Sequence, residues 1–245
     1  MEKIQELNAI QAVLGDYAMQ TAFSTFAVSR NEGTRNDIAR MKGARFVAST
    51  EANDGSRFDE AVVKQLTGGD RIAARFLYQE YFEFTPVFKL FIAANYKPTV
   101  FGQDNAMWRR IRLIPFEVAI PPEEQDKNLP EKLLAEKSGI LNWALAGCTE
   151  WQKNGLQHPE QVSEATAEYK SEMDILREFL EDCCIIGDGF KVDFKLLYSE
   201  YKQWADDNSE KPLGRNRFNK KIEAKGIDRV FLAGSRCWKG IGLKI

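Results

Sequence analysis

Short apolar runs alternate with stretches of helical periodicity along the first half of the chain. Apolar residues at three- and four-residue spacing predict an amphipathic helix over residues 3–14, and a shorter helix is expected over 36–41. Three apolar runs without that periodicity predict buried strands, at residues 45–49, 88–94 and 111–116. Short apolar strands separated by helices favour a mostly parallel sheet covered by helices, so the expected fold class is α/β.

Two further segments lie between the first and second predicted strands. Ser56-Arg57-Phe58-Asp59 has the pattern of a helix N-terminus, and apolar positions continue the helix to Gly68-Gly69. Irregular alternation with many aromatic residues over 71–84 predicts extended or hairpin structure. The first half therefore reads as a sheet with helices and one projecting hairpin.

The middle of the chain is predominantly helical. A break over residues 119–130 contains Pro121-Pro122, and helical periodicity then predicts helices over about 129–153 and 159–182. This segment is acidic, with ten Asp/Glu and five Lys/Arg between residues 119 and 173. We expect it to form a helical linker or lid.

The end of the chain has the pattern of a winged helix. Gly187-Asp188-Gly189 is followed by helical patterns over 194–206 and 215–225, and then by a hairpin-like pair around Gly234-Ser235. Two helices followed by a two-stranded wing are typical of this module. The expected domains are residues 1–118, 119–186 and 187–245.

Composition excludes several classes of protein. The 245 residues are 44% apolar and 29% charged, as in a protein that forms a core. No apolar run approaches the roughly 18–20 residues that span a bilayer, and charges interrupt the N-terminus, so we expect a cytoplasmic protein without membrane contact. The four cysteines lack paired C-x-x-C spacing and His158 is the single histidine. No metal cluster or Ser-His-Asp triad is therefore expected.

Positive charge is concentrated near the C-terminus. The net charge of the chain is −2, but residues 211–245 carry ten Lys/Arg and two Asp/Glu, or +8 in 35 residues. Apolar residues accompany this charge, which indicates a folded basic surface and favours nucleic acid as its partner. The alternatives are a solvated face that maintains solubility and a winged fold used for protein contacts.

Polar residues follow or precede each predicted strand. Glu51 follows the first strand, Asn95 ends the second, and Arg109-Arg110 precede the third. Ligands bind at the carboxyl edge of parallel sheets, where an acid suits Mg²⁺ and water activation and an amide can orient that water. An arginine can neutralise charge on a phosphoryl group in its own or a neighbouring chain. Taken singly, each residue could equally be a solvated strand end or turn.

The order of these residues resembles the phage and plasmid primase-helicases, which are superfamily 3 helicases. The resemblance covers about residues 8–118. It implies an AAA-like core that binds ATP and Mg²⁺, forms a ring of six subunits on single-stranded DNA in a bacterial host, and follows a primase domain. The segments that carry it are Glu51 after its strand, KQLTGGDRIAAR at 64–75, FKLFIAANYKP at 88–98, and WRRI at 108–111 with Pro115-Phe116.

The resemblance implies a role for each motif. Glu51 resembles the Walker B acid that holds Mg²⁺, Asn95 the sensor that positions water, and Arg110 or Arg109 the finger that reaches a neighbouring subunit's ATP. Arg71 and Arg75 would lie at or beside a hairpin that grips single-stranded DNA. The family's third motif would comprise Lys64, Gly68, Gly69 and Asp70. Without the resemblance, Gly68-Gly69 requires only a tight turn.

One departure from the family concerns ATP. No glycine of the chain begins a G-x-x-x-x-G-K-[ST] motif, the loop that cradles phosphates with backbone N–H groups, a lysine and a hydroxyl. The family places this loop just before the helix that residues 8–17 resemble. We therefore expect the loop on a missing upstream segment or another polypeptide, and no tight ATP binding or hydrolysis by this chain alone.

The winged module supplies a second set of DNA-binding candidates. If 215–225 is a recognition helix, its DNA-facing side chains and those of the wing would make mainly phosphate contacts. We expect part of a replicative helicase; the alternatives are a non-catalytic DNA-binding or replication-accessory protein and a winged-helix transcription regulator. The candidates are Arg215, Asn216, Arg217, Lys220 and Lys221 on the helix, with Arg236 and Lys239 on the wing.

Overall fold

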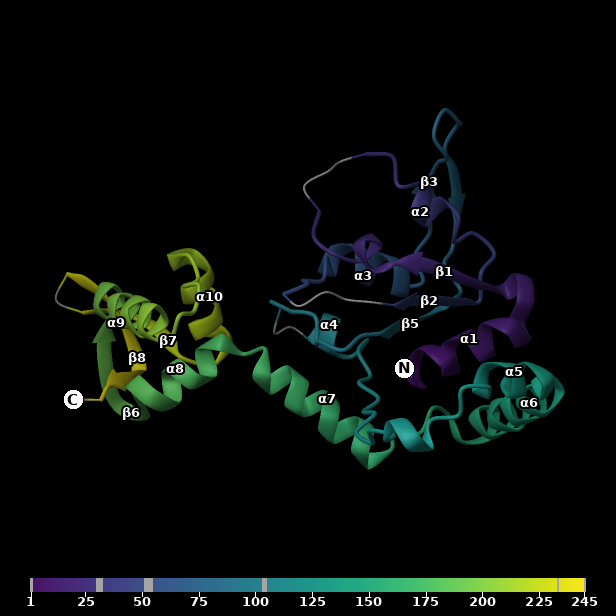
Figure 1. Ribbon diagram of the computed structural model, residues 1–245. Helices are drawn as coiled ribbons and strands as arrows, with labels where there is room; N and C mark the ends of the chain where they lie inside the picture. The colour runs from purple at the N-terminus through teal and green to yellow at the C-terminus, as the bar shows by residue number, and fades with distance from the viewer. Residues whose placement is uncertain (1, 30–32, 51–54, 103–104, 233, 245) are drawn as a thin grey trace. The chain divides into compact units, whose positions relative to one another are not determined.

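The computed structural model describes residues 2–29, 33–50, 55–102, 105–232 and 234–244, which form two compact units. The first unit spans Met1–Met173 and the second Asp174–Ile245. The chain has a mixed α/β fold, with a parallel sheet covered by helices, a helical middle and a small antiparallel C-terminal sheet (Figure 1). This confirms the predicted fold class.

A three-stranded parallel sheet forms the centre of the first unit. Its order is β1 (Ala18–Ala22), β2 (Phe46–Thr50) and β5 (Lys89–Ala93), so β2 is central. The apolar run of β2 is buried on both faces, as expected for a covered parallel strand. Strand β1 was not predicted, because its sequence AMQTA has neither a sustained apolar run nor clear alternation.

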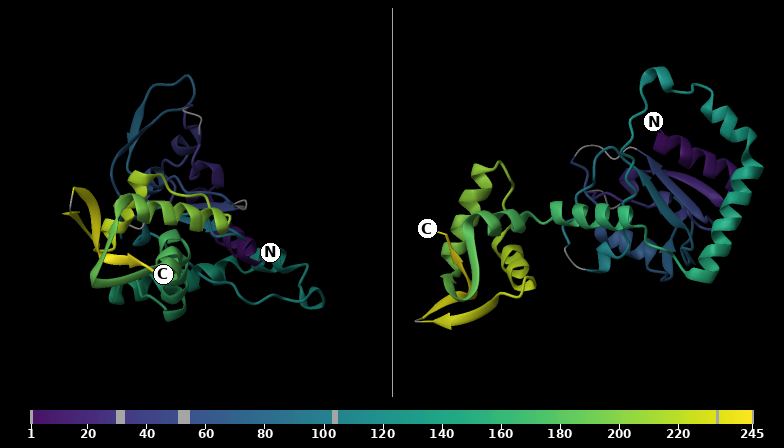
Figure 2. Two further views of the ribbon diagram at one scale, coloured as in Figure 1. Left: turned by 90° about the vertical axis from the view of Figure 1, so that its left-hand side faces the viewer. Right: turned by 90° about the horizontal axis from the view of Figure 1, so that it is seen from below.

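The two faces of this sheet are covered differently. Helix α1 (Glu2–Leu14) places Leu7 against Phe46 and Ala48 on one face. Val47 lies in the larger core of the other face, which includes Leu66 of α3 (Glu60–Thr67). Two views of the ribbon show α1 beside the sheet (Figures 1 and 2). The alternation of Phe46, Val47 and Ala48 between these faces follows from the period of two in a strand.

Two local predictions in this unit were wrong. Helix α3 is capped by Asp59, whose carboxylate accepts hydrogen bonds from Ala61 N and Val62 N, and so it begins later than the Ser56 pattern predicts. Residues 111–116 do not form a strand. Leu113 N donates instead to Thr166 Oγ1 of helix α7 (Glu160–Glu172), and Pro115 has no N–H to offer a sheet.

The first unit also contains a hairpin and several short helices. Strands β3 (Ile72–Ala74) and β4 (Phe82–Phe84) pair antiparallel, which confirms the predicted hairpin. The short helices are η1 (Gly15–Tyr17), η2 (Phe23–Thr25), α2 (Asn36–Ala39), α4 (Asn105–Trp108) and η3 (Pro122–Glu124).

The middle of the chain is helical, as predicted, but its helices are shorter. The expected helix over 129–153 is divided at Glu136 into α5 (Leu129–Ala135) and α6 (Lys137–Asn154), and neither has a buried residue. The expected helix over 159–182 is divided after Glu172 into α7 (Glu160–Glu172) and α8 (Ile175–Cys183). Helix α7 is fixed to the rest of the first unit, because the Tyr169 hydroxyl donates a hydrogen bond to Pro98 O.

The second unit has the element order of a winged helix. Its antiparallel sheet has the order β6-β8-β7, and helices α9 and α10 lie where the sequence predicts them. Strand β6 was not predicted. The predicted three-part division of the chain stays a prediction. The elements are α8 (Ile175–Cys183), β6 (Cys184–Asp193), α9 (Phe194–Asp207), α10 (Arg215–Ala224), β7 (Asp228–Leu232) and β8 (Ser235–Leu243).

Candidate functional site

The carboxyl ends of the three parallel strands meet at one edge of the sheet. The register aligns Ala22 with Thr50 and Thr50 with Ala93, so β1, β2 and β5 end together. Asn95 is exposed two residues beyond β5. Glu51 follows Thr50 directly in the sequence but lies outside the described residues. The strands therefore bring Asn95 to the edge at which β2 ends with Thr50.

Ser49 adds a polar group to the end of the central strand. Its side chain is fully buried, and Oγ has no hydrogen-bond partner among the described residues. Buried hydroxyls normally have a hydrogen-bond partner. The Ser49 hydroxyl is therefore available to a partner from outside the described part of the chain. The signal in the sequence is a serine at the end of the apolar run Phe46-Val47-Ala48.

The Gly-Gly turn after α3 has two geometric requirements. Gly69 has φ of 83°, in the left-handed region that favours glycine. A Cβ at Gly68 would lie 2.8 Å from the Lys64 carbonyl oxygen and 3.7 Å from Arg110 Nη2. The Lys64 carbonyl oxygen is therefore too close to Gly68 for a side chain there, and Arg110 Nη2 lies at ordinary contact distance from the same turn. The structure brings the predicted third motif together with one of the two candidate finger residues.

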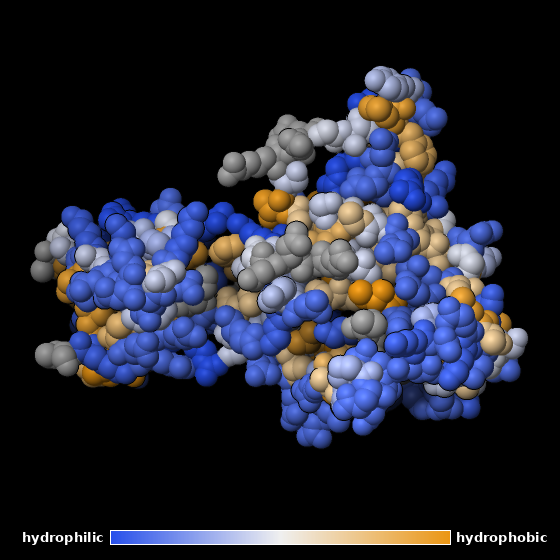
Figure 3. Space-filling view, in the orientation of Figure 1, coloured by the Kyte–Doolittle hydropathy of each residue, from blue (hydrophilic) through white to orange (hydrophobic). Residues whose placement is uncertain are grey.

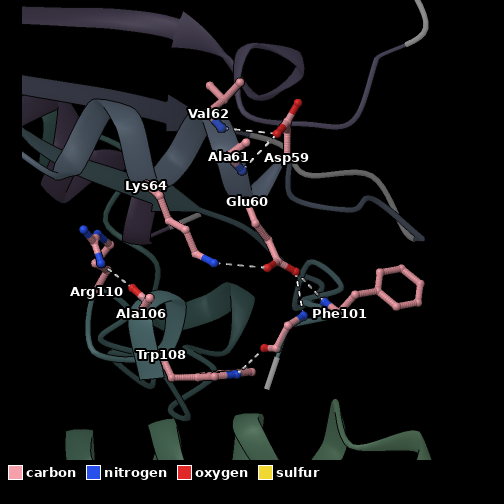
Figure 4. A network of polar contacts seen from close by, with 10 residues as sticks. Asp59, Glu60, Ala61, Val62, Lys64, Phe101, Ala106, Trp108 and Arg110 are labelled. Carbon is pink, nitrogen blue, oxygen red and sulfur yellow. Dashed lines mark hydrogen bonds and ion pairs between the residues drawn. The ribbon is translucent and has the colours of Figure 1, made fainter. Parts of the chain in front are cut away.

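A polar network fixes the start of α3 to the segment that leads into α4 (Figure 4). Glu60 Oε1 accepts hydrogen bonds from Phe101 N at 2.9 Å and Gly102 N at 2.7 Å, and Lys64 Nζ lies 3.7 Å from Glu60 Oε2. The Trp108 indole N–H donates to Gly102 O at 2.8 Å. These contacts fix the position of Lys64 relative to the residues just after α4.

The two candidate finger arginines have different environments. Arg109 is exposed, whereas the Arg110 side chain is partly buried and donates from Nη1 to Ala106 O within α4 (Figure 4). Arg110 Nε is buried without a hydrogen-bond partner among the described residues. Arg109 can reach solvent in this conformation, and Arg110 would first have to release its bond to Ala106.

The β3–β4 hairpin projects from the first unit (Figure 1). It carries cations and aromatic rings: Arg71 lies 3.4 Å from Glu83 across the hairpin, and the Arg75 guanidinium lies 4.9 Å from the Tyr81 ring centroid. Tyr78 is 96% exposed and has φ of 62°, so the turn points its ring into solvent. Apolar side chains gather at this tip in the space-filling view (Figure 3). Cations beside exposed rings suit a single-stranded nucleic acid.

Sequence reasoning missed Tyr78 and Tyr81 as candidates. The signal available in the sequence is the pair of aromatic residues between the two short strands. The loop is also held in place: Leu77 N donates to Asn36 Oδ1 of α2 at 2.7 Å. This contact orients the hairpin within the first unit.

Most of the predicted DNA-binding residues of α10 are exposed. Arg215, Asn216, Arg217 and Lys220 face solvent, whereas Lys221 is partly buried and makes contacts within the unit. The Arg215 guanidinium lies 5.1 Å from the Tyr198 ring centroid. The helix therefore presents three cations and an amide on its outer surface.

A shallow depression beside α10 adds two lysines of α9 to this surface. Its lining comprises Asp193, Lys195, Leu196, Tyr198, Ser199, Lys202 and Arg215, of which Asp193 is acidic and caps α9. Sequence reasoning assigned α9 only to the core, because its apolar residues dominate the pattern. The positions of Lys195 and Lys202, seven residues apart on one helix face, are the signal that could have found them.

The wing places its two predicted cations differently. Arg236 is exposed opposite Phe231 in the β7–β8 register, whereas Lys239 pairs across the strands with Asp228. A carboxylate beside Lys239 offsets its positive charge, since opposite charges facing each other interact. Arg236 is therefore the stronger candidate for contact with a phosphate.

Metal-ligating side chains are dispersed in the described part of the chain, and two of its thiols have raised pKa values. No group of three or more metal-ligating side chains occurs in the part of the chain that the structure describes. Burial raises the pKa of the Cys184 thiol to about 12, and burial also raises the pKa of Cys183, so neither thiolate forms readily at neutral pH. Within the same residues, no helix combines the length and apolarity that a bilayer crossing requires.

Comparison with known proteins identifies similar viral proteins. Residues 171–231 match the family described as "Poxvirus D5 protein-like". The chain is 30% identical over 227 residues to "Putative helicase L207/L206" of Acanthamoeba polyphaga mimivirus, which covers 84% of this chain and 23% of that protein. It is 27% identical over 241 residues to "Putative helicase 022R" of Frog virus 3, which covers 90% of this chain and 24% of that protein.

A solved structure titled as the A form apo structure of the NrS-1 C terminal region aligns with 97% of this chain and 63% of that chain. Its TM-score is 0.44 at 9% identity. The chain spans about a quarter of the length of the two viral relatives. The comparisons therefore show partial similarity to viral helicase-like proteins of the D5 type.

Proposed function

We propose that this chain supplies the water-positioning, arginine-finger and DNA-binding parts of a superfamily 3 DNA helicase. The observation that carries the proposal is the shared carboxyl edge of β2 and β5, where Glu51 and Asn95 follow the strands. The similarity to viral proteins named as helicases supports it. The complete protein would use ATP to move along single-stranded DNA and open a replication fork of a virus or mobile element.

Each group at the edge has a distinct task in ATP hydrolysis. Glu51 would hold Mg²⁺ and activate a water, and Asn95 would orient that water toward the γ-phosphate. Arg109 or Arg110 would neutralise the charge that develops on the transferred phosphoryl group. ATP and Mg²⁺ are therefore the cofactors of the proposed complete site.

The residues of this chain do not form a complete seat for ATP. The sequence has no phosphate loop, and so the N–H cradle, the lysine and the Mg²⁺-binding hydroxyl are not supplied by it. Among the described residues, β5 pairs only with β2, so its other edge could accept one more parallel strand. We propose that a segment outside this chain supplies that strand together with the loop.

The proposed arginine finger requires that several subunits of the complete protein assemble. An arginine that acts on a neighbour's ATP requires head-to-tail contacts between subunits, and such contacts close into a ring. We expect six subunits, with the β3–β4 hairpins and the winged units contacting DNA. A primase domain on the complete protein remains part of the same proposal.

The test joins the missing segment of the complete protein to this chain and measures ATP hydrolysis with and without single-stranded DNA. DNA-stimulated hydrolysis that Glu51→Gln and Asn95→Ala abolish would support the proposal. Mixing inactive Glu51→Gln subunits with inactive Arg110→Ala subunits, and separately with Arg109→Ala subunits, identifies the finger. Activity recovers only if the arginine acts across a subunit boundary. DNA binding without any hydrolysis by the extended protein would contradict the helicase proposal.

A second candidate is a non-catalytic DNA-binding or replication-accessory protein. The missing phosphate loop and the exposed cations of α10 favour it. This function requires DNA binding but no hydrolysis by any extended form of the chain. A winged-helix regulator, by contrast, would prefer one defined duplex sequence over forked or single-stranded DNA.

A further inference from the structure

The wing of the second unit ends in an exposed aromatic residue. Phe231 lies next to the end of β7, before the turn that contains Gly234, and its side chain is 71% exposed. Single exposed apolar residues are common on protein surfaces and need no explanation by themselves. Phe231 differs because of its place at a hairpin tip and because of the residues on the same face.

The face that carries Phe231 also carries two arginines and the buried Trp238. Arg236 lies directly opposite Phe231 in the antiparallel register, and directly opposed residues share a face of the sheet. Arg229 lies two residues before Phe231 and therefore on the same face. Its guanidinium lies 5.6 Å from the Trp238 ring centroid and is paired with Glu223 of α10. Arg229 thus fixes the hairpin to the body of the unit, and Arg236 has no ion-pair partner among the described residues.

An exposed aromatic ring beside an arginine that has no ion-pair partner among the described residues is suited to binding nucleic acid. The ring can stack on a base, the guanidinium can contact the adjacent phosphate, and the surrounding segment 211–245 has a charge of +8. Insertion of a ring into an intact duplex must first unstack a base step. Stacking on a base pair that is already exposed at the end of a duplex carries no such cost.

We propose that Phe231 stacks on the terminal base pair at a junction between duplex and single-stranded DNA, with Arg236 on the adjacent phosphate. The proposal rests on the proposed function, because it assumes that the second unit binds DNA. It assigns the wing to the open end of the duplex and α10 to the phosphates beside it. The β7–β8 hairpin then holds the point at which strands separate.

The experiment measures binding of the full chain to three DNAs at one salt concentration: a fork, a single strand, and a duplex whose ends are blocked with streptavidin. We expect wild type to prefer the fork over the blocked duplex by about tenfold. Phe231→Ala should lose that preference and keep its affinity for the blocked duplex. Phe231→Tyr, which retains a ring, should keep the preference. Arg217→Ala should weaken all three complexes together.

A local signal separates stacking from general affinity. With 2-aminopurine at the terminal pair of the fork, stacking by Phe231 should quench its fluorescence in wild type and Phe231→Tyr but not in Phe231→Ala. Fork preference that persists in Phe231→Ala would overturn the proposal. Equal, salt-sensitive binding of wild type to all three DNAs would overturn it while leaving the DNA-binding function in place. No binding to any DNA would overturn both.

One further outcome identifies a protein partner. If Phe231→Ala converts a self-associated chain to monomer in sedimentation and leaves fork preference unchanged, the ring belongs to an interface between copies, and the proposal is overturned. Because Phe231 is exposed, its replacement should leave the near-ultraviolet circular dichroism of the second unit unchanged, which excludes misfolding as the cause of any loss.

Discussion

The two units of this protein bury their apolar residues to different extents. In the second unit, rings from three helices meet: Tyr201 and Phe218 stack with centroids 4.6 Å apart, and Phe179 contacts both. In the first unit, α6 has no buried residue, and its Trp143 and Trp151 are 69% and 56% exposed. The second unit closes a core from its own residues, whereas the first leaves an apolar helix face uncovered.

The units also differ in what joins their elements. In the first unit, polar contacts join segments far apart in sequence, such as Glu60 with the backbone at 101–102 and Tyr169 with Pro98 O, beside an apolar core. In the second unit, a cluster of packed rings joins α8, α9 and α10. Polar contacts set geometry and fail when one partner is removed, while packed rings resist unfolding through buried area. A site that positions Lys64 and Arg110 requires polar contacts, because these set the geometry of the side chains.

The largest effect that would test this comparison comes from Phe218. Phe218→Ala removes a fully buried ring from the centre of the second unit, and we expect the free energy of unfolding of that unit to fall by about 3–5 kcal/mol. Urea denaturation of the full chain, followed by near-ultraviolet circular dichroism, measures it. Phe231→Ala is the matched control, with an expected change of about 0.5 kcal/mol or less. Equal losses in both variants would show that the ring cluster does not hold the unit together.

The polar contacts of the first unit predict a smaller effect. Glu60→Ala leaves the N–H groups of Phe101 and Gly102 without their acceptor, which should lower the free energy of unfolding of the first unit by about 1–3 kcal/mol. Glu60→Gln keeps an acceptor oxygen and should cost less. Urea denaturation of both variants measures the difference. An Ala variant as stable as the Gln variant would contradict the role assigned to this carboxylate.

Each unit contains one buried tyrosine, and alkaline pH should destabilise both units. Burial raises the pKa of Tyr169 and of Tyr201 above the value of about 10 in the unfolded chain. The unfolded state then loses these protons first, so the stability contribution is complete below pH about 10 and is lost as pH rises through the folded pKa values. The ultraviolet absorbance of tyrosinate, in native and unfolded chain, measures the shift.

Single substitutions assign that shift to one unit or the other. Tyr201→Phe should remove the late-titrating component of the second unit and leave that of the first, and Tyr169→Phe should do the reverse. If neither substitution changes the titration above pH about 10, the two rings are not buried as described.

The sequence predicts the local elements well where one pattern dominates. Strands β2 and β5, helix α1 and the hairpin β3–β4 follow from apolar runs and spacing, because each is stabilised mainly by its own buried face. The segment 111–116 has the same apolar character but no strand neighbour. Its backbone bonds to Thr166 of α7, a contact between residues 53 positions apart that no local pattern encodes.

The candidate site is only partly visible from the sequence. Asn95 and the Gly68-Gly69 turn can be placed from strand ends and turn chemistry. The approach of Arg110 to Gly68 depends on how α3 packs against α4, and the exposure of Phe231 depends on how far toward the hairpin tip the second unit covers the face that Phe231 shares with Trp238. Packing between elements decides both, and periodicity within one element does not.

The smallest predicted effect concerns the cysteines of the two units, and it tests the exposed helix face directly. Cys148 lies exposed on α6, whereas Cys184 is buried and its pKa is raised to about 12. At pH about 8, iodoacetamide should therefore modify Cys148 well before Cys184, because the thiolate is the reactive form and must be accessible. Mass spectrometry of the two peptides over time measures the rates, and labelling in urea provides the control in which they converge. Slow labelling of Cys148 in the folded chain would mean that a second copy covers α6 in solution. The first unit would then cover the apolar face of α6 by self-association. The difference in burial between the two units would in that case exist only in the isolated chain.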